Sequence, residues 1–377
     1  MNDRLQRTAH QFEQATAPEA VFGEIHGTVD EKLAGLKRIY HQLAKIVHPD
    51  SYHTREEQSL AQTAFTRLSE WCSTAEIKIR AGVYGLDRPG ATLLQTKKRA
   101  YSLDGSCKDD GLYHRYPCRF EEDGRSVRAL IKMVRDERDN DLAQNEARVI
   151  RALLNGKEAR KFAPYIPRWV DSFVYGEHGE DRQANVFEQP EGWYSLAEVR
   201  QAYPVGVDSK DMAWMWRRLL VVLGFAHLNS IIHGTVLPRN VLIQPEQHGL
   251  LLVEWSFAVT DPQTSGAHIT ALDLAYEPWY PNEVRHKDIP GPETDIYMAA
   301  QCMIDLLGGD PLHQSLPAAV PNPIRMFLKA CTLPAKKARP HDAWGLKEEF
   351  DELLRRLWGE RKFHPFTMLK STTTIGG

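Results

Sequence analysis

The chain is poor in cysteine and in long apolar runs. Its 377 residues include five cysteines, which are widely spaced and odd in number, so they indicate neither a disulfide framework nor a paired zinc signature. The most apolar stretch, residues 219–228, is much shorter than the ~20 residues of a membrane span. Residues 1–14 are too polar for a signal peptide. These absences predict a cytoplasmic protein that has no membrane partner.

A strong net charge is also absent. The formal net charge is -3, which gives no overall field to attract a polyanion and argues against nucleic acid as a partner. Apolar residues make up 42% of the chain and charged residues 26%, as in ordinary globular proteins. A chain of this length has room for two or three domains.

The first part of the chain has a helical pattern. Residues 1–17 form a polar lead-in for which we expect no stable helix, and residues 18–88 form the first domain. Two apolar stripes recur there at steps of three and four residues, which is typical of amphipathic helices. The first stripe contains Leu33, Leu36, Tyr40, Leu43 and Val47; the second contains Ala61, Ala64, Phe65, Leu68, Cys72 and Ala75. A short loop between two such helices predicts an antiparallel hairpin.

The character changes after a linker at residues 89–98. Short β-like runs follow at residues 101–103, 113–120 and 127–134, and long helical runs begin at residue 208. Strands that precede helices predict an α+β domain with two lobes, at residues 99–359. Residues 360–377 form a C-terminal tail, of which residues 371–377 are small and polar.

The loop between the two helices contains a short motif, His48-Pro49-Asp50. The preceding helix has basic residues on the side away from its apolar stripe, namely Lys37, Arg38, His41 and Lys45. With this context the segment resembles the J-domain (DnaJ-like) family. The resemblance implies that the basic face meets an acidic surface of a DnaK-type chaperone ATPase, and that the tripeptide couples docking to ATP hydrolysis.

Two plainer interpretations compete with this one. A tripeptide of this kind can simply end a helix, since short motifs arise by chance, and a charged helix face is usually just solvated. The flanking helices, the Tyr84-Gly85 pair after them and a short first helix at residues 20–23 favour the J-domain.

From about Leu103 to Gly359 the order of several motifs resembles the eukaryotic-type protein kinase family. Lys132, in Ala-Leu-Ile-Lys, matches the strand lysine that contacts the ATP phosphates, and Glu146 matches the helix glutamate that holds that lysine. By themselves, a lysine and a glutamate at these positions are equally compatible with an ordinary surface pair.

The catalytic loop of that family is altered in residues 231–242. Asn240 is retained, but Thr235 stands where the family has the aspartate that accepts the substrate proton, and Gly234 stands where it has arginine. A threonine hydroxyl has no conjugate base near neutral pH and cannot serve as that acceptor. Leu237 replaces the lysine that would stabilise the transferred phosphate. The resemblance therefore implies no catalytic residue.

The nucleotide-binding parts are only partly retained. Glu254 stands where the family has the metal-binding aspartate, and Gly105 and Gly111 lie in the region of the glycine-rich loop without its spacing. The resemblance implies that no cofactor is required. ATP, if bound, would contact Lys132, Glu146, Asn240 and Glu254, and Mg²⁺ would be held by Asn240 and Glu254.

Residues that stabilise the large lobe of the family are retained. Glu283 matches the Ala-Pro-Glu glutamate, Asp295 matches the buried aspartate of the central helix, and Arg339 matches the arginine that pairs with that glutamate. We expect an ion pair between Arg339 and Glu283. A retained scaffold with missing chemistry is typical of a pseudokinase.

The main hypothesis is a DnaJ-like co-chaperone that recruits and stimulates a DnaK-type ATPase, with the kinase-like domain binding an unknown client or acting as a scaffold. The alternative is an atypical ATP-dependent serine/threonine kinase with a non-standard catalytic loop. A third hypothesis is an assembly scaffold in which the tripeptide has no role. Fold alone does not decide among them.

Overall fold

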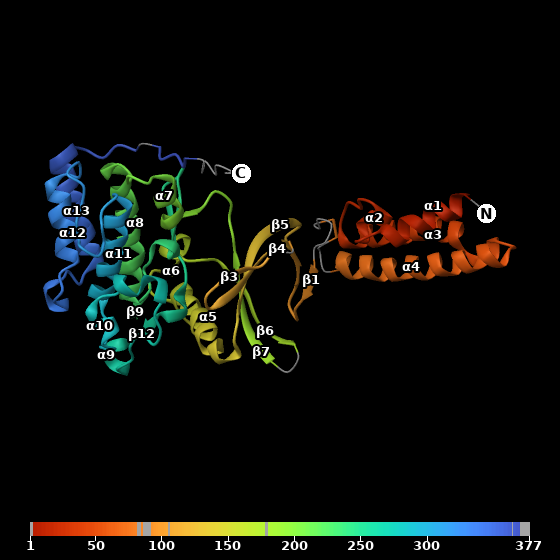
Figure 1. Cartoon of the computed structure of the whole chain (residues 1–377), viewed down its shortest axis with the longest axis horizontal. Helices are drawn as coiled ribbons and strands as arrows, with labels where there is room; N and C mark the ends of the chain where they lie inside the picture. The colour runs from red at the N-terminus through yellow and green to blue at the C-terminus, as the bar shows by residue number, and fades with distance from the viewer. Residues whose placement is uncertain are drawn as a thin grey trace, which may run out of the picture. The chain divides into compact units, whose positions relative to one another are not determined.

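The computed structural model describes residues 3–80, 84–85, 92–104, 106–177, 180–363 and 365–369. The chain divides into two compact units (Figure 1). The first comprises residues 1–137 and 170–189, and the second comprises residues 138–169 and 190–377.

The first unit begins with a helical region. Its helices are α1 (Asp3–Gln14), α2 (Glu19–Phe22), α3 (Val29–Val47), the 3₁₀ helix η1 (Pro49–Ser51) and α4 (Arg55–Arg80). Thr28 caps α3 in a capping box with Glu31: its hydroxyl accepts the Glu31 amide, and the Glu31 carboxylate accepts the Thr28 amide. Two backbone donors at the start of the helix are thereby satisfied. The predicted hairpin of two amphipathic helices is confirmed, and so is the short helix near residues 20–23.

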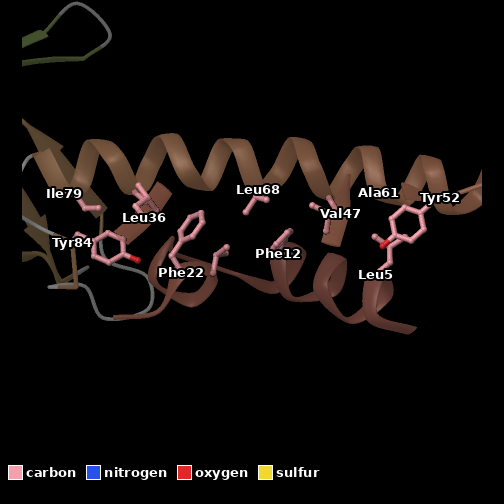
Figure 2. Close-up of a cluster of buried hydrophobic side chains, with 13 residues drawn as sticks. Leu5, Phe12, Phe22, Leu36, Val47, Tyr52, Ala61, Leu68, Ile79 and Tyr84 are labelled. Atoms are coloured by element: carbon pink, nitrogen blue, oxygen red, sulfur yellow. The ribbon is translucent and has the colours of Figure 1, made fainter. Parts of the chain in front are cut away.

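The predicted absence of a helix in residues 1–17 is wrong. Leu5 and Phe12 of α1 are buried in the same apolar core as Leu36 and Leu68, and Figure 2 shows this row of side chains between α4 and the other helices. The indole of Trp71 also donates to the Phe12 carbonyl, 3.1 Å away. Two large apolar residues in a polar segment are a weak signal by themselves, and the neighbouring helices supply the rest of the core.

A largely buried ion pair joins the start of α2 to the last turn of α4. The Lys78 ammonium lies 2.9 Å from a carboxylate oxygen of Glu19, and that carboxylate also accepts the Gly85 amide at 2.9 Å. The Tyr84 hydroxyl donates to the Gly23 carbonyl at 2.9 Å. Burial, together with the charge of Glu19, raises the pKa of Tyr84, so this hydroxyl stays a donor.

The first unit also contains an antiparallel sheet. The strands in its described residues are β1 (Thr92–Gln95), β2 (Ala100–Leu103), β3 (Lys108–Asp110), β4 (Tyr113–Glu122), β5 (Arg125–Val134), β6 (Trp169–Glu177) and β7 (Glu180–Glu188). The order is β1-β2-β4-β5-β7-β6, with β3 on β4. Ala129, Ile131 and Met133 alternate along β5 into an apolar core, as the two-residue period of a strand requires.

The three predicted runs of strand are confirmed as β2, β4 and β5, but the sheet extends further than predicted. β1 lies inside the predicted linker at residues 89–98, where Thr92 to Gln95 pair with Leu103 to Ala100; residues 89–91 lie outside the described residues. The hairpin of β6 and β7 was not predicted. Gly111 lies at the turn between β3 and β4, and Gly105 lies outside the described residues.

The second unit is mostly helical. Its helices are α5 (Asn140–Asn155), α6 (Ala159–Phe162), α7 (Leu196–Ala202), α8 (Ser209–Leu228), α9 (Pro262–Ser265), α10 (Asn282–Arg285), α11 (Pro292–Leu306), α12 (Asn322–Cys331) and α13 (Ala343–Trp358). α8 is apolar on nearly all sides and packs against α11 and α13. A helix of that composition belongs at the centre of a core.

Short strands and 3₁₀ helices connect these helices. The strands are β8 (Tyr194–Ser195), β9 (Ile231–Ile232), β10 (Val241–Gln244), β11 (Gly249–Leu252) and β12 (Val259–Thr260). The 3₁₀ helices are η2 (Glu137–Asp139), at the junction of the two units, η3 (Ala163–Tyr165), η4 (Pro238–Asn240), η5 (Trp255–Phe257), η6 (Leu274–Trp279) and η7 (Lys336–Ala338). β10 pairs with both β8 and β11, and β9 pairs with β12.

The C-terminal tail is partly packed on the second unit. Phe366 is buried, with its ring 5.4 Å from that of Tyr203, and Thr367 accepts a hydrogen bond from the Tyr203 hydroxyl. The segment runs from the end of α13 past α8 toward α7 (Figure 1). Residues 371–377 lie outside the described residues.

A helical region, an antiparallel sheet and a further set of helices fit the predicted multidomain α+β class. In the described part of the chain, no helix has the combination of length and apolarity that crossing a membrane requires.

We predict that Lys78→Met destabilises the helical region by about 3 kcal/mol, because it leaves the Glu19 carboxylate without its buried partner. Amides of α3 and α4 should then exchange about 100-fold faster when hydrogen exchange is followed by mass spectrometry. Arg80→Met is the matched control, since Arg80 and Glu76 form an exposed pair and such pairs contribute little. Equal exchange in the two variants would show that the buried pair does not close this region.

Candidate functional site

The helix α3 ends at the predicted recognition turn. His48 is extended, with ψ of 126°, because the residue before a proline is disfavoured in the helical conformation. Pro49 then begins η1, and its fixed φ suits the first position of a helix. The helix α3 therefore ends at Val47 and η1 begins at Pro49, with only His48 between them.

Hydrogen bonding fixes the tripeptide locally. The Asp50 amide donates to Nδ1 of His48 at 3.3 Å, so in the neutral imidazole Nε2 carries the proton. The His48 ring meets the Phe65 ring edge-on, 5.5 Å between centroids. The Asp50 side chain is 90% exposed and that of His48 is 48% exposed. An imidazole and a carboxylate are thus presented to solvent from a stiff turn.

The predicted basic face is exposed. The side chains on the outer surface of α3 are Lys37, Arg38, His41 and Lys45. Leu36 and Val47 of the same helix are buried in the core, so the apolar and basic sides are separated as predicted. The structure therefore brings the basic face and the tripeptide together along one helix and its end.

The residues predicted to contact a nucleotide are divided between the two units. Lys132 lies on β5 of the first unit, where it is buried and its ammonium is 4.3 Å from the centre of the Tyr113 ring. Glu146, Asn240 and Glu254 are buried in the second unit. The predicted pair of Lys132 with Glu146 therefore stays a prediction.

Within the second unit, α5 is attached to the turn that carries Glu254. The side-chain amide of Asn145 donates to the carbonyls of Ser256 and Ala258, both at 2.9 Å. Glu254 has φ of 70° and ψ of 60°, a left-handed conformation that is uncommon for residues other than glycine. The Ser256 hydroxyl donates to the Glu254 carboxylate at 2.9 Å. No motif or periodic pattern indicates the roles of Asn145 and Ser256.

Thr235 is enclosed in this loop. Its side chain is buried, and its hydroxyl donates to the Glu254 carbonyl at 3.2 Å. Its own carbonyl accepts the side-chain amide of Asn240 at 2.9 Å. The threonine and the retained asparagine therefore hold the loop together by contacts within the protein.

His233 is held in one neutral form. Its Nε2 lies 3.0 Å from the Val253 carbonyl, which can only accept, and its Nδ1 accepts the Thr235 amide at 3.2 Å. Burial lowers the pKa of His233, and this outweighs the opposing effect of Asp295. With both ring nitrogens engaged and the ring buried, His233 is not available as a general base.

A single carboxylate holds the start of this loop. Asp295 of α11 accepts the amides of His233 and Gly234 at 2.9 and 2.8 Å, and Nε2 of His227 lies 2.9 Å from it. Gly234 has φ of 77°, and a Cβ there would lie 2.9 Å from Ile269. Glycine is therefore required by the backbone at position 234.

The predicted pair of Arg339 with Glu283 is confirmed. The guanidinium contacts both carboxylate oxygens, at 2.6 and 3.2 Å, and both side chains are buried. The Thr294 hydroxyl adds a third hydrogen bond to Glu283, at 3.1 Å. Removing one partner of such a pair costs about 3–5 kcal/mol, so these residues stabilise the fold.

Asn240 and Glu254 offer one carboxylate and one amide oxygen to a metal ion. Mg²⁺ is usually bound through one or two carboxylates together with substrate phosphates, so these two residues would depend on phosphate oxygens to complete a site. Among the described residues, no three His, Cys, Asp or Glu side chains form a group that could hold a metal ion.

A scan of protein-family models finds no match to this chain, and a search of curated proteins finds none either. The resemblances to J-domains and to protein kinases therefore rest on the quoted sequence motifs.

We predict that Thr235→Asp does not produce phosphotransfer and destabilises the second unit by about 3 kcal/mol or more, because it buries a carboxylate that lacks a cationic partner. Incubation with labelled ATP and Mg²⁺ measures phosphotransfer. Urea unfolding followed by tryptophan fluorescence measures stability, since Trp71 is the only tryptophan before residue 138.

The control is Thr235→Val, which keeps the side-chain shape and removes only the hydroxyl, at a cost of about 1–2 kcal/mol. A stable Thr235→Asp variant that phosphorylates protein substrates would show that the loop opens and that the missing base is its only defect.

Proposed function

We propose that the helical region is a J-domain-like module that stimulates a DnaK-type chaperone ATPase, and that the second unit, with strands from the first, forms a kinase-like module that binds a client. The observation that carries the first part is the exposed His48-Pro49-Asp50 turn at the end of the basic helix α3.

The turn suits the recognition of another protein. Its histidine and aspartate are solvent-exposed, and Pro49 together with the His48 to Asp50 hydrogen bond restricts the conformations available before binding. Restricting a loop in advance lowers the entropy lost on association. A partner that reads both an imidazole N–H and a carboxylate would therefore find them already arranged.

The charge on α3 suits an acidic partner surface. Exposed Lys37, Arg38 and Lys45 carry positive charge at neutral pH, and none of them forms an ion pair within the described residues. Unpaired surface charges of one sign increase the rate of association with an oppositely charged surface. The basic face lies on α3 and the His48-Pro49-Asp50 turn directly follows that helix, so one partner can contact both.

The kinase-like part of the proposal is supported by topology and by the loop. The strand β5 that carries Lys132 is followed in the chain by α5, which carries Glu146, and then by the β6–β7 hairpin. This is the order that the family requires for its lysine and glutamate. Thr235 is buried, His233 has both ring nitrogens engaged, and no other base stands at the family's position, so we propose binding without phosphotransfer.

We predict that His48→Gln reduces stimulation of a DnaK-type chaperone ATPase by at least about tenfold, because glutamine lacks the imidazole ring. The measurement is steady-state ATP turnover by the chaperone over a range of concentrations of the full chain. The control is His53→Gln, the same substitution at another exposed histidine five residues along the chain. Stimulation that is equal in both variants and in the unmodified chain would exclude the proposed role of the turn.

We predict that Lys37→Glu combined with Arg38→Glu raises the concentration needed for half-maximal stimulation by about tenfold at low salt, since each 1.4 kcal/mol is one factor of ten. The defect should shrink in 0.5 M salt, where screening acts over only a few ångströms. Arg67→Glu, on the exposed side of α4, is the control. A defect of unchanged size in high salt would show that the basic face acts through folding and not through charge.

A further inference from the structure

The second unit contains a cavity of about 690 Å³ that plays no part in the function proposed above. It lies between α8, α13, the β10–β11 turn and the segment that follows α13. Cavities of a few hundred Å³ are the usual size for small-molecule sites. Side chains that characterise its wall are Trp214 and Arg217 of α8, His248 of the turn, Asp351 of α13, and Arg361 and Phe363 of the C-terminal segment.

One part of the wall is aromatic. The rings of Trp214 and His248 are stacked. Their centroids are 4.1 Å apart and the angle between their planes is 4°. Phe363 lies against His248 with its centroid 4.4 Å away. Trp358 also lines the cavity, with the Lys210 ammonium 5.7 Å from its ring. This part of the wall offers flat apolar surface on which a planar ring can stack.

Another part of the wall is cationic. Arg217 contacts both carboxylate oxygens of Asp351, one of them at 3.1 Å, and Lys347 donates to the same carboxylate at 2.8 Å. Burial raises the pKa of Asp351, but these hydrogen bonds outweigh it and hold the pKa below its usual range. Burial and the neighbouring guanidiniums of Arg217 and Arg218 lower the pKa of Arg361.

The wall of the cavity carries five cationic side chains, Lys210, Arg217, Arg355, Arg361 and Lys362, and four carboxylates, Glu348, Asp351, Glu352 and Glu360. Glu352 is engaged by Arg355 and Arg356, while Glu348 and Glu360 also line the cavity but are solvent-exposed. Arg361 is solvent-exposed as well, so water screens its charge in the same way as those of the two glutamates. An additional anion next to Arg217 and Arg361 would offset the excess positive charge.

We propose that this cavity binds a small ligand that combines a planar ring with a phosphate or carboxylate group. The ring stacks on the aromatic wall formed by Trp214, His248 and Phe363, and the anionic group binds Arg361 beside the Arg217 to Asp351 pair. Phosphate and carboxylate are both met by the planar donor geometry of guanidinium. The residues predicted to contact ATP are absent from this wall, so the cavity is distinct from the predicted ATP contacts.

The test is calorimetric titration of the full chain with four probes: phenyl phosphate, benzoate, inorganic phosphate and phenol. We expect at least one of the two ring-bearing anions to bind about tenfold tighter than both inorganic phosphate and phenol, because only they use both parts of the wall. The tighter of the two identifies the anionic group. The proposal would be overturned if neither phenyl phosphate nor benzoate bound more tightly than inorganic phosphate and phenol.

Two variants locate the binding. Arg361→Gln should weaken the ring-bearing anion about tenfold, and Arg356→Gln, an exposed arginine that pairs with Glu352 and does not line the cavity, should leave it unchanged. Phe363→Ala should weaken both ring-bearing probes and leave inorganic phosphate unaffected; Phe363 is 60% exposed, so the fold should tolerate the change. Equal effects of the two arginine variants would place the ligand elsewhere. Chaperone stimulation is measured separately and is not expected to respond to these probes.

Discussion

The Asp295 carboxylate is the constraint on which the altered loop of the second unit depends. It is fully buried and satisfied by two backbone amides and by His227. Charge-assisted hydrogen bonds of this kind are roughly twice as strong as neutral ones, and a buried carboxylate without them would be costly. These hydrogen bonds therefore hold the start of the loop, residues 233–234, against α11.

The residue types at positions 234 and 235 follow from this anchoring. Because the Gly234 amide must reach Asp295 while the backbone turns through a positive φ, glycine fits at this position. Thr235 then points inward and bonds the Glu254 carbonyl, which holds the glutamate turn. Gly234 and Thr235 are thus parts of one internally bonded loop.

Sequence patterns predicted those parts of the molecule in which several residues repeat one signal. The stripe from Leu33 to Val47 and the Arg339 to Glu283 pair were both identified, the first by periodicity and the second by motif order. α1 was missed because its two core residues, Leu5 and Phe12, stand in a polar segment and are buried only by helices farther along the chain. Tertiary context decides such cases over local pattern.

The candidate sites were predictable to different degrees for the same reason. The His48-Pro49-Asp50 turn is local, so its sequence describes its structure almost completely. The hydrogen bonds of Asn145, Ser256 and His227 join positions that are far apart in the chain or carry no motif, and the cavity wall combines three separate segments. Long-range arrangements of this kind leave no periodic or spaced signal in a single sequence.

The contact between Glu19 and the Gly85 amide joins the start of α2 to a residue that follows α4 in the chain. Its geometric meaning is that the bundle is completed only after α4 has ended, by two residues that belong to no helix. A fragment that stopped at Arg80 would retain every helix and yet lose Tyr84 and this last amide. The folding unit therefore extends past the end of α4 to include Tyr84 and Gly85.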